Sequence, residues 1–165
     1  MSEQGAREEL SLQQLLPEFA RLKSRFPAGF ESSLVLPCLR RVQEKRGYVD
    51  DRDIDALVDY LGVPRIQIEE VLSFYTQFRR HPIGRWHVQC CRNVTCSMRS
   101  AERLIDHLSK KIGVAPGGTT PDGRFTLSTV ECLGSCGTAP VVMVNDTYHE
   151  NMSVEKLDAL LNELK

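Results

Sequence analysis

Two pairs of cysteines constrain how this chain can fold. Cys91 and Cys96 have four residues between them, Cys132 and Cys136 have three, and 35 residues separate the two pairs. A single centre bound by all four thiolates requires the intervening segment to bring the second pair beside the first. The spacing therefore predicts a thiolate-ligated metal or iron–sulfur centre, with each pair holding one side of it.

The composition is that of an ordinary soluble protein. The 165 residues are 41% hydrophobic and 26% charged, enough for one domain or two small ones. Residues 1–10 are polar and lack the apolar core of a signal peptide, and no apolar run is long enough to cross a membrane. We therefore expect a cytoplasmic protein, without direct membrane insertion, whose six cysteines are free or ligating rather than paired in disulfides.

The charge pattern argues against nucleic-acid binding. The net charge is −1, and residues 1–85 hold 13 basic and 13 acidic side chains. Residues 53–75 resemble a helix-turn-helix, which beside a cluster would suggest an iron–sulfur transcription regulator. The candidate recognition helix, however, carries Glu69 and Glu70 where a basic face is needed. We expect no nucleic-acid partner.

The first half of the chain has helical periodicity. An apolar stripe through residues 8–26 predicts a helix that Pro17 kinks or splits in two. A second helix is predicted to begin near Pro37, which suits a first turn, and to end at Gly47. Together with two helices that follow, these elements predict an all-helical region over residues 1–80.

The two further helices complete this region. The third is predicted to begin at Asp50 or Asp51 and to end at Gly62, and the fourth to begin at Pro64. We expect the aromatic residues near the end of the fourth helix, Phe74 included, to belong to the core rather than to a docking surface. The apolar face of this helix holds Ile68, Val71, Leu72, Tyr75 and Phe78.

The periodicity changes after residue 81. A helix is predicted over roughly residues 97–112, with Met98 on its buried face, and a last helix after Ser153. This order predicts a small sheet with helices packed against it over residues 81–165, and an α+β fold class for the whole chain. Strands are predicted over residues 86–91, with one face buried, and over 125–130, 141–144 and 147–149.

The positions of the cysteines favour a [2Fe-2S] cluster but leave zinc open. All four sit at or just beyond predicted strand ends, and Cys96 lies just before a predicted helix whose free N–H groups would stabilise a thiolate. Small residues in the second loop, such as Gly134, would let backbone amides approach the sulfurs. Zinc sites accept both spacings, so a zinc-stabilised interaction domain without a redox role remains an alternative. A thioredoxin-type redox disulfide is less favoured, because neither pair is C-x-x-C.

Other features are assigned to structure rather than chemistry. Cys90 lies on the inner face of a predicted strand and Cys38 early in a predicted helix, so both are predicted to pack in the core. Residues 117–120 read GGTT, which suits phosphate but lacks the lysine of a P-loop, so we predict a turn. No G-x-G-x-x-G follows a strand, so we expect no dinucleotide site in this chain.

Six motifs share their order and spacing with one known family. They are LRRVQEKRGYV (39–49), YLGVP (60–64), VLSFYTQF (71–78), TPDGRFTL (120–127), ECLGSC (131–136) and APV (139–141). With these motifs, nearly the whole chain from about residue 31 closely resembles the 24-kDa subunits of NADH:quinone oxidoreductase (complex I), in the thioredoxin-like [2Fe-2S] ferredoxin family. The same module occurs in NAD-linked hydrogenases and formate dehydrogenases.

The resemblance implies a fold and a function together. It implies an N-terminal helical bundle followed by a thioredoxin-like domain that binds one [2Fe-2S] cluster through Cys91, Cys96, Cys132 and Cys136. It also implies an electron-transfer subunit, not catalytic alone, that docks on a flavin- and NADH-binding subunit among the other subunits of the peripheral arm. FMN and NADH would be bound by that partner, and the complex would hold the chain peripheral to the inner membrane. The alternative is the same module in a soluble NAD-linked hydrogenase or formate dehydrogenase.

Overall fold

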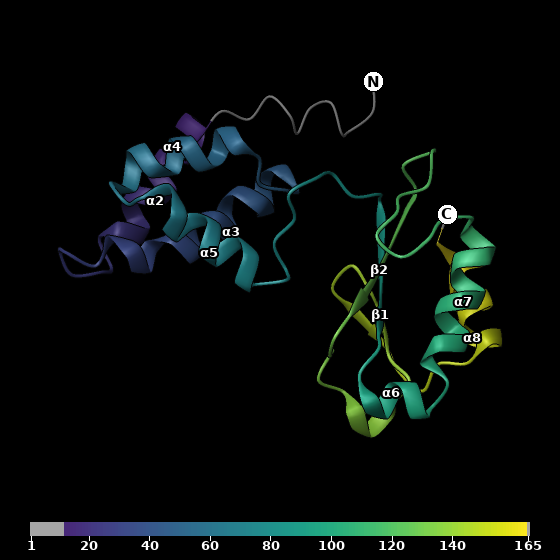
Figure 1. The fold of residues 1–165 in the computed structure, drawn as a ribbon. Coiled ribbons are helices and arrows are strands. Elements are labelled where there is room, and N and C mark those ends of the chain that lie inside the picture. Colours follow the sequence, from purple (N-terminus) through teal and green to yellow (C-terminus); the bar gives the residue numbers. More distant parts are fainter. Residues whose placement is uncertain (1–11, 165) are drawn as a thin grey trace. The chain divides into compact units, whose positions relative to one another are not determined.

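The structure, a computed structural model, describes residues 12–164 (Figure 1). The chain separates into two compact units, and the division falls between Pro82 and Ile83. The first unit is helical and the second contains the sheet.

The first unit consists of four α-helices and two short 3-10 helices among the described residues. A core of aliphatic and aromatic side chains joins them, and several of these, including Phe19, Leu39, Leu57 and Ile68, have no exposed surface. The elements are η1 (Leu12–Leu15), α2 (Leu16–Lys23), η2 (Glu31–Leu34), α3 (Val35–Arg46), α4 (Asp51–Leu61) and α5 (Arg65–Phe74).

The first predicted helix is split near Pro17, one of the two outcomes that the sequence allows. Residues 8–11 of that prediction lie outside the described residues. The remainder forms η1 and then α2, with Pro17 in the first turn of α2, where its missing N–H removes no helical hydrogen bond. The helix ends at Lys23, three residues before the predicted end at residue 26.

Helix boundaries in the rest of this unit follow local capping chemistry. Helix α3 begins at Val35, two residues before Pro37, and ends at Arg46, where the predicted cap Gly47 has a left-handed φ of 90°. Asp50 caps α4: its side chain accepts a hydrogen bond from the Asp53 amide (3.0 Å), and the Asp53 carboxylate accepts one from the Asp50 amide (2.9 Å). This reciprocal capping box fixes the start of the helix.

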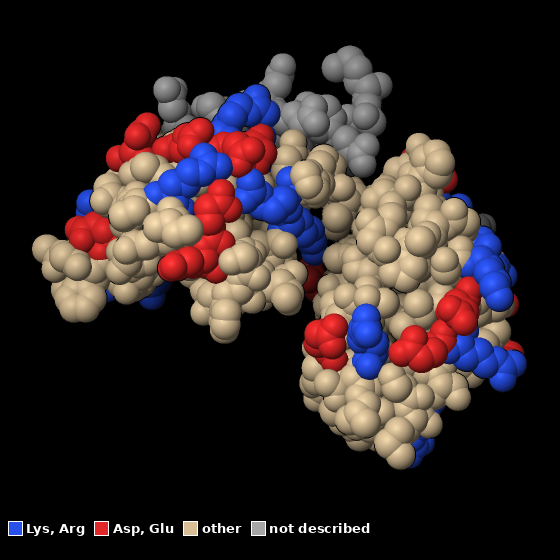
Figure 2. Space-filling view, in the orientation of Figure 1, with Lys and Arg blue, Asp and Glu red and all other residues tan. Residues whose placement is uncertain are grey.

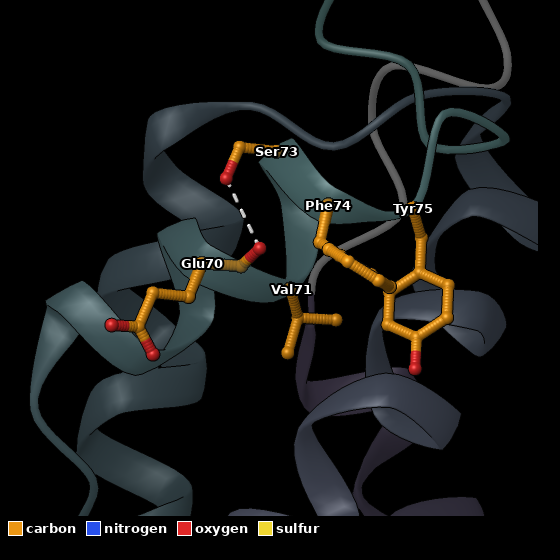
Figure 3. Close-up of a pocket in the computed structure, with 5 residues that line it drawn as sticks. All are labelled: Glu70, Val71, Ser73, Phe74 and Tyr75. Carbon is orange, nitrogen blue, oxygen red and sulfur yellow. Dashed lines mark hydrogen bonds between the residues drawn. The ribbon is translucent and has the colours of Figure 1, made fainter.

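The expectation that Phe74 and Tyr75 belong to the core is wrong. Helix α5 ends at Phe74, which is 77% exposed, and Tyr75 is 38% exposed, whereas Phe78 is buried. Successive helical residues are about 100° apart, so Phe74 lies off the face that carries Ile68 and Leu72. Both side chains line a hollow of about 600 Å³ at this helix end, and Figure 3 shows them among the residues that line it.

Acidic and basic side chains on the helical unit form ion pairs and do not form separate acidic or basic patches. Figure 2 shows acidic and basic groups interspersed over the face in view. Arg65 lies 2.7 Å from Asp51 and 3.1 Å from Glu69, and Arg80 contacts the same two carboxylates at 2.7 and 2.9 Å. The basic residues near α5 are thus neutralised locally.

The second unit is built on a four-stranded mixed sheet in the order β2-β1-β3-β4. Strand β1 (Trp86–Cys91) is parallel to β2 (Phe125–Val130) and antiparallel to β3 (Val142–Val144), which pairs with β4 (Thr147–His149). The four predicted strands are therefore confirmed, with β3 starting one residue later than predicted. The α+β fold class is confirmed as well.

Two helices, α7 (Ala101–Ile112) and α8 (Val154–Glu163), lie on one side of this sheet (Figure 1). They bury the face of β1 that carries Val88 and Cys90. The expectation that only one face of β1 is buried is wrong, because His87 and Cys91 on the other face are also buried. Strand β1 has a neighbouring strand on each side, which shields both faces more than at a sheet edge.

The single helix predicted over residues 97–112 is in fact two. A short helix, α6 (Val94–Met98), precedes α7, and Ser100 between them has a φ of 68°. A non-glycine residue in this left-handed region cannot continue a helix. The interruption turns Met98 outward, and its side chain is 83% exposed rather than buried as predicted.

The GGTT segment forms a turn that leads to a single bridge with β2, and the predicted turn is confirmed. The Gly117 amide donates to the Leu127 carbonyl (2.7 Å), and the Gly118 amide donates to the Ala115 carbonyl (2.9 Å). An isolated bridge joins Thr119 to Thr126 on β2. Both glycine amides are already used, so they are not free to receive a phosphate.

Candidate metal centre

The sheet brings the two cysteine-containing segments together at the ends of the parallel strands β1 and β2. Cys91 is the last residue of β1, and its neighbour in the parallel register is Val130, the last residue of β2. The Arg92 amide donates to the Val130 carbonyl (3.0 Å), and the Cys91 amide donates to the Val141 carbonyl (3.2 Å). The loop that carries Cys132 and Cys136 therefore leaves and returns beside Cys91.

Cys96 lies inside α6, not just before a helix as predicted. It is the third residue of α6, and its side chain is 1% exposed. It packs with Cys91 and Val141 in a small buried cluster. Burial raises the pKa of the Cys96 thiol, and the Cys91 side chain raises it further, whereas the Val141 backbone lowers it. The surroundings of the free thiol therefore favour its neutral form, contrary to the expectation from a helix N-terminus.

The second loop presents its thiols at the surface. Cys132 and Cys136 are both exposed. Gly134 between them has a φ of 76°, and its amide points back to donate a hydrogen bond to Cys132 Sγ (3.3 Å). The expected approach of a backbone amide to a sulfur is thus present at Cys132. Such hydrogen bonds stabilise a thiolate and tune a bound cluster.

The donor chemistry of the site suits a thiolate-bound group. All six cysteines are free, and the neighbouring Cys91 and Cys136 thiols both act to raise the pKa of the Cys96 thiol. Across residues 12–164, no three His, Cys, Asp or Glu side chains are grouped closely enough to hold a metal ion in this structure. The case for a bound group therefore depends on the chemistry of the donors. Four sulfur ligands from two neighbouring segments suit both an iron–sulfur cluster and zinc.

The remaining two cysteines occupy hydrophobic cores, as predicted. Cys38 is fully buried among the helices of the first unit, and Cys90 lies under α7 and α8. Burial raises the pKa of each thiol to about 12. Cys90 and Cys91 are adjacent in β1, so their side chains point to opposite faces of the sheet.

One group at this site was not predicted from the sequence. Glu150, just after β4, accepts hydrogen bonds from the Ser135 and Thr138 hydroxyls, which flank Cys136. Ser135 and Thr138 are three residues apart, a spacing typical of hydroxyls at a tight turn. Nothing in the sequence indicates that a glutamate at position 150 would meet them.

The fold and the two thiol pairs define the class of protein. The chain belongs to the thioredoxin-like [2Fe-2S] ferredoxin family, whose pattern matches residues 19–165. The resemblance inferred from the motifs is thereby confirmed. None of the helices within residues 12–164 has both the length and the apolar character needed to cross a membrane.

Within this class, the chain is similar to subunits of NADH-quinone oxidoreductase. It is 42% identical over 148 residues to an NADH-quinone oxidoreductase component of Rhizobium meliloti, covering 90% of this chain and 87% of that protein. It is 38% identical over 143 residues to NADH-quinone oxidoreductase subunit 2 of Thermus thermophilus, covering 86% of this chain and 79% of that one.

A solved structure shares the fold. The crystal structure of an NAD+-reducing [NiFe]-hydrogenase in the air-oxidized state matches 79% of this chain with a TM-score of 0.68 and 22% identity. The matching part is 22% of the hydrogenase chain. At this identity the likeness concerns the fold alone.

Proposed function

We propose that this chain is an electron-transfer subunit of an NADH:quinone oxidoreductase. In this proposal Cys91, Cys96, Cys132 and Cys136 bind one [2Fe-2S] cluster, which exchanges single electrons with the flavin of a partner NADH-binding subunit. The observation that carries the proposal is the pairing of Cys91 with both ends of the second cysteine loop, at Val130 and Val141. The sequence similarity to quinone oxidoreductase subunits supports the choice of parent enzyme.

The chain's own residues would bind the cluster and bury one side of it. The cluster would supply one-electron redox chemistry, which no protein side chain here provides. Cys91 and Cys96 would hold it from the buried side, since both side chains are almost fully enclosed. Cys132 and Cys136 would hold it from the exposed side, where an electron could pass to a partner. The Gly134 amide would stabilise charge on Cys132.

The surface near the cysteines suits a protein partner. Val94 and Met98 on α6 are 66% and 83% exposed, and Tyr148 on β4 is 48% exposed. The end of the unit that carries α6 is largely free of charged side chains in the view of Figure 2. Exposed apolar side chains such as these are typical of a site that a partner covers.

We propose the remaining organisation on the same basis. Residues 1–80 would form a helical region and residues 81–165 the cluster domain. FMN and NADH would be bound by the partner subunit, and the other subunits of the peripheral arm would place the chain at the cytoplasmic side of the inner membrane. The second candidate is the same role in a soluble NAD-linked hydrogenase, which the shared fold favours.

Metal analysis of the anaerobically purified chain tests the cluster. We expect a red-brown protein with about two iron atoms and two sulfides per chain and a rhombic EPR signal after reduction. A colourless protein containing zinc would instead show the alternative, an interaction domain without a redox role. The large subunits that co-purify from the native host would identify the parent enzyme.

A further inference from the structure

The loop that carries Cys136 is tied to a carboxylate from another part of the sheet. Glu150 Oε1 accepts hydrogen bonds from Ser135 Oγ and from Thr138 Oγ1, the latter at 2.6 Å. The two hydroxyl oxygens are also within hydrogen-bonding distance of each other, at 2.7 Å, and either can be the donor. Each hydroxyl has one proton to donate, so an ionised carboxylate satisfies both. These hydrogen bonds lower the pKa of Glu150, which keeps it ionised at neutral pH.

The two hydroxyls bracket a proposed cluster ligand. Ser135 precedes the 3-10 turn η3 (Cys136–Thr138), and Thr138 ends it. The Thr138 amide donates to the Ser135 carbonyl (3.2 Å), which closes the turn. The carboxylate therefore holds both ends of the turn in which Cys136 lies. It acts on Cys136 through the two hydroxyls and not through a contact with the sulfur.

A backbone clamp joins the same two segments independently of these side chains. The Asn151 amide donates to the Thr138 carbonyl (2.7 Å), and the Met152 amide donates to the Pro140 carbonyl (3.0 Å). Removing the Glu150 carboxylate should therefore leave the two segments adjacent and the fold intact. The turn around Cys136, however, should lose its fixed orientation.

The charge of Glu150 is not neutralised by an ion pair. None of the salt bridges within residues 12–164 includes this carboxylate, and its side chain is exposed. A negative charge near a cluster opposes the addition of an electron and so lowers the reduction potential. Glu150 is thus placed to act on the cluster by geometry and by charge.

We propose that Glu150 is a positioning residue for the [2Fe-2S] cluster, holding the turn that presents Cys136 and lowering the reduction potential. This inference rests on the proposed function, because it requires that a cluster is bound. Residues that orient metal ligands from outside typically change metal affinity about 10–100-fold when they are removed. Glu150 belongs to this group, with Ser135 and Thr138 as the intermediaries.

Two substitutions of Glu150 in the full-length, cluster-loaded chain separate geometry from charge. Glu150→Ala removes the acceptor, and we expect iron release to a chelator to become roughly tenfold faster. Glu150→Gln keeps an oxygen that can accept from both hydroxyls, so iron release should stay close to the wild-type rate. Glu163→Ala, an exposed glutamate in α8, is the matched control and should change neither iron release nor reduction potential.

Redox titration followed by EPR tests the charge. Glu150→Gln should raise the reduction potential, whereas Glu163→Ala should not. The double variant Ser135→Ala with Thr138→Val should release iron as fast as Glu150→Ala, and adding Glu150→Ala to it should have no further effect, because all three residues act through one contact. Circular dichroism of each variant should match the wild type.

The outcomes separate this inference from the proposed function. If Glu150→Ala releases iron at the wild-type rate, the positioning role is overturned. If the reduction potential of Glu150→Gln is unchanged, the role of the charge is overturned. Either result in a wild-type chain that carries its cluster leaves the proposed function standing. A wild-type chain that binds no iron at all would instead remove the proposed function, and this inference with it.

Discussion

At the scale of single residues, the six cysteines divide by their surroundings. Cys38 and Cys90 are held in hydrophobic cores, where burial raises the pKa of each thiol to about 12 and keeps it protonated. The four proposed ligands instead lie at or just beyond the ends of β1 and β2, on the same end of the sheet. Reactivity therefore follows from position in the fold more than from the number of cysteines.

Substitution of individual cysteines tests this division. Cys132→Ser should abolish or strongly weaken cluster assembly, because it removes one of four thiolates. Cys90→Ala should keep the cluster, since that side chain faces α7 and α8 and alanine adds no polar atom to the core. Iron and sulfide content of the purified variants measures both. Loss of the cluster in Cys90→Ala would show that the ligand assignment is wrong.

Asp50 makes the stability of the helical unit depend on pH. Burial acts to raise the pKa of Asp50, but hydrogen bonds from the Asp53 amide, Arg52 and Arg46 outweigh it and lower the pKa from 3.8 to about 2. A carboxylate with a lowered pKa contributes stability that is fully present above its unfolded-state pKa of 3.8. This contribution, about 2 kcal/mol, is lost as the pH falls through the folded-state pKa.

Asp50→Asn should therefore remove stability mainly above pH ~4. Asparagine is also a good N-cap, so the substitution removes the charge while the cap of α4 is retained. Urea unfolding at about pH 5 should show the variant less stable by about 2 kcal/mol, with the difference shrinking towards about pH 2. An equal difference at both pH values would contradict a role for the ionised carboxylate.

At the scale of secondary-structure elements, local signals determined most boundaries. The caps at Gly47, Asp50 and Ser153 lie where the sequence predicts them, and three of the four strands have their predicted bounds. The largest error arose where one residue departs from the regular backbone. Ser100 adopts a left-handed conformation that its sequence neighbourhood does not require, and it divides the helix predicted over residues 97–112.

Two phenylalanines near the end of α5 should differ strongly in their effect on stability. Phe78 is buried in the core of the helical unit, so Phe78→Ala should lower the free energy of unfolding by about 3 kcal/mol or more. Phe74 is 77% exposed, so Phe74→Ala should change it by less than about 1 kcal/mol. Chemical denaturation of the isolated chain measures both. A large loss from Phe74→Ala would mean that its side chain packs in the folded chain.

At the scale of the whole molecule, the two units have separate cores. The core of the first unit contains Cys38 but no proposed cluster ligand, and all four ligands belong to the second unit. Binding of a cluster stabilises the unit that forms its site, because a group that binds only the folded state adds to its stability. The effect of the cluster should therefore be confined to the second unit.

Removal of iron under reducing conditions tests this separation. The thermal transition of the second unit, followed by the fluorescence of Trp86, should move to lower temperature in the iron-free chain. The helical signal of the first unit should unfold at an unchanged temperature. A shift of both transitions by the same amount would show that the two units unfold as one cooperative body.

The sequence by itself determined most helix caps, the strand positions and the family, and it supplied the proposed cluster ligands. These depend on properties that are local in the chain, such as alternation of apolar residues, cap chemistry and the spacing within each cysteine pair. The tertiary structure alone decided that both ends of the second loop lie beside Cys91 and that Glu150 meets Ser135 and Thr138. Such contacts depend on strand order and register, which bring together residues that no local pattern connects.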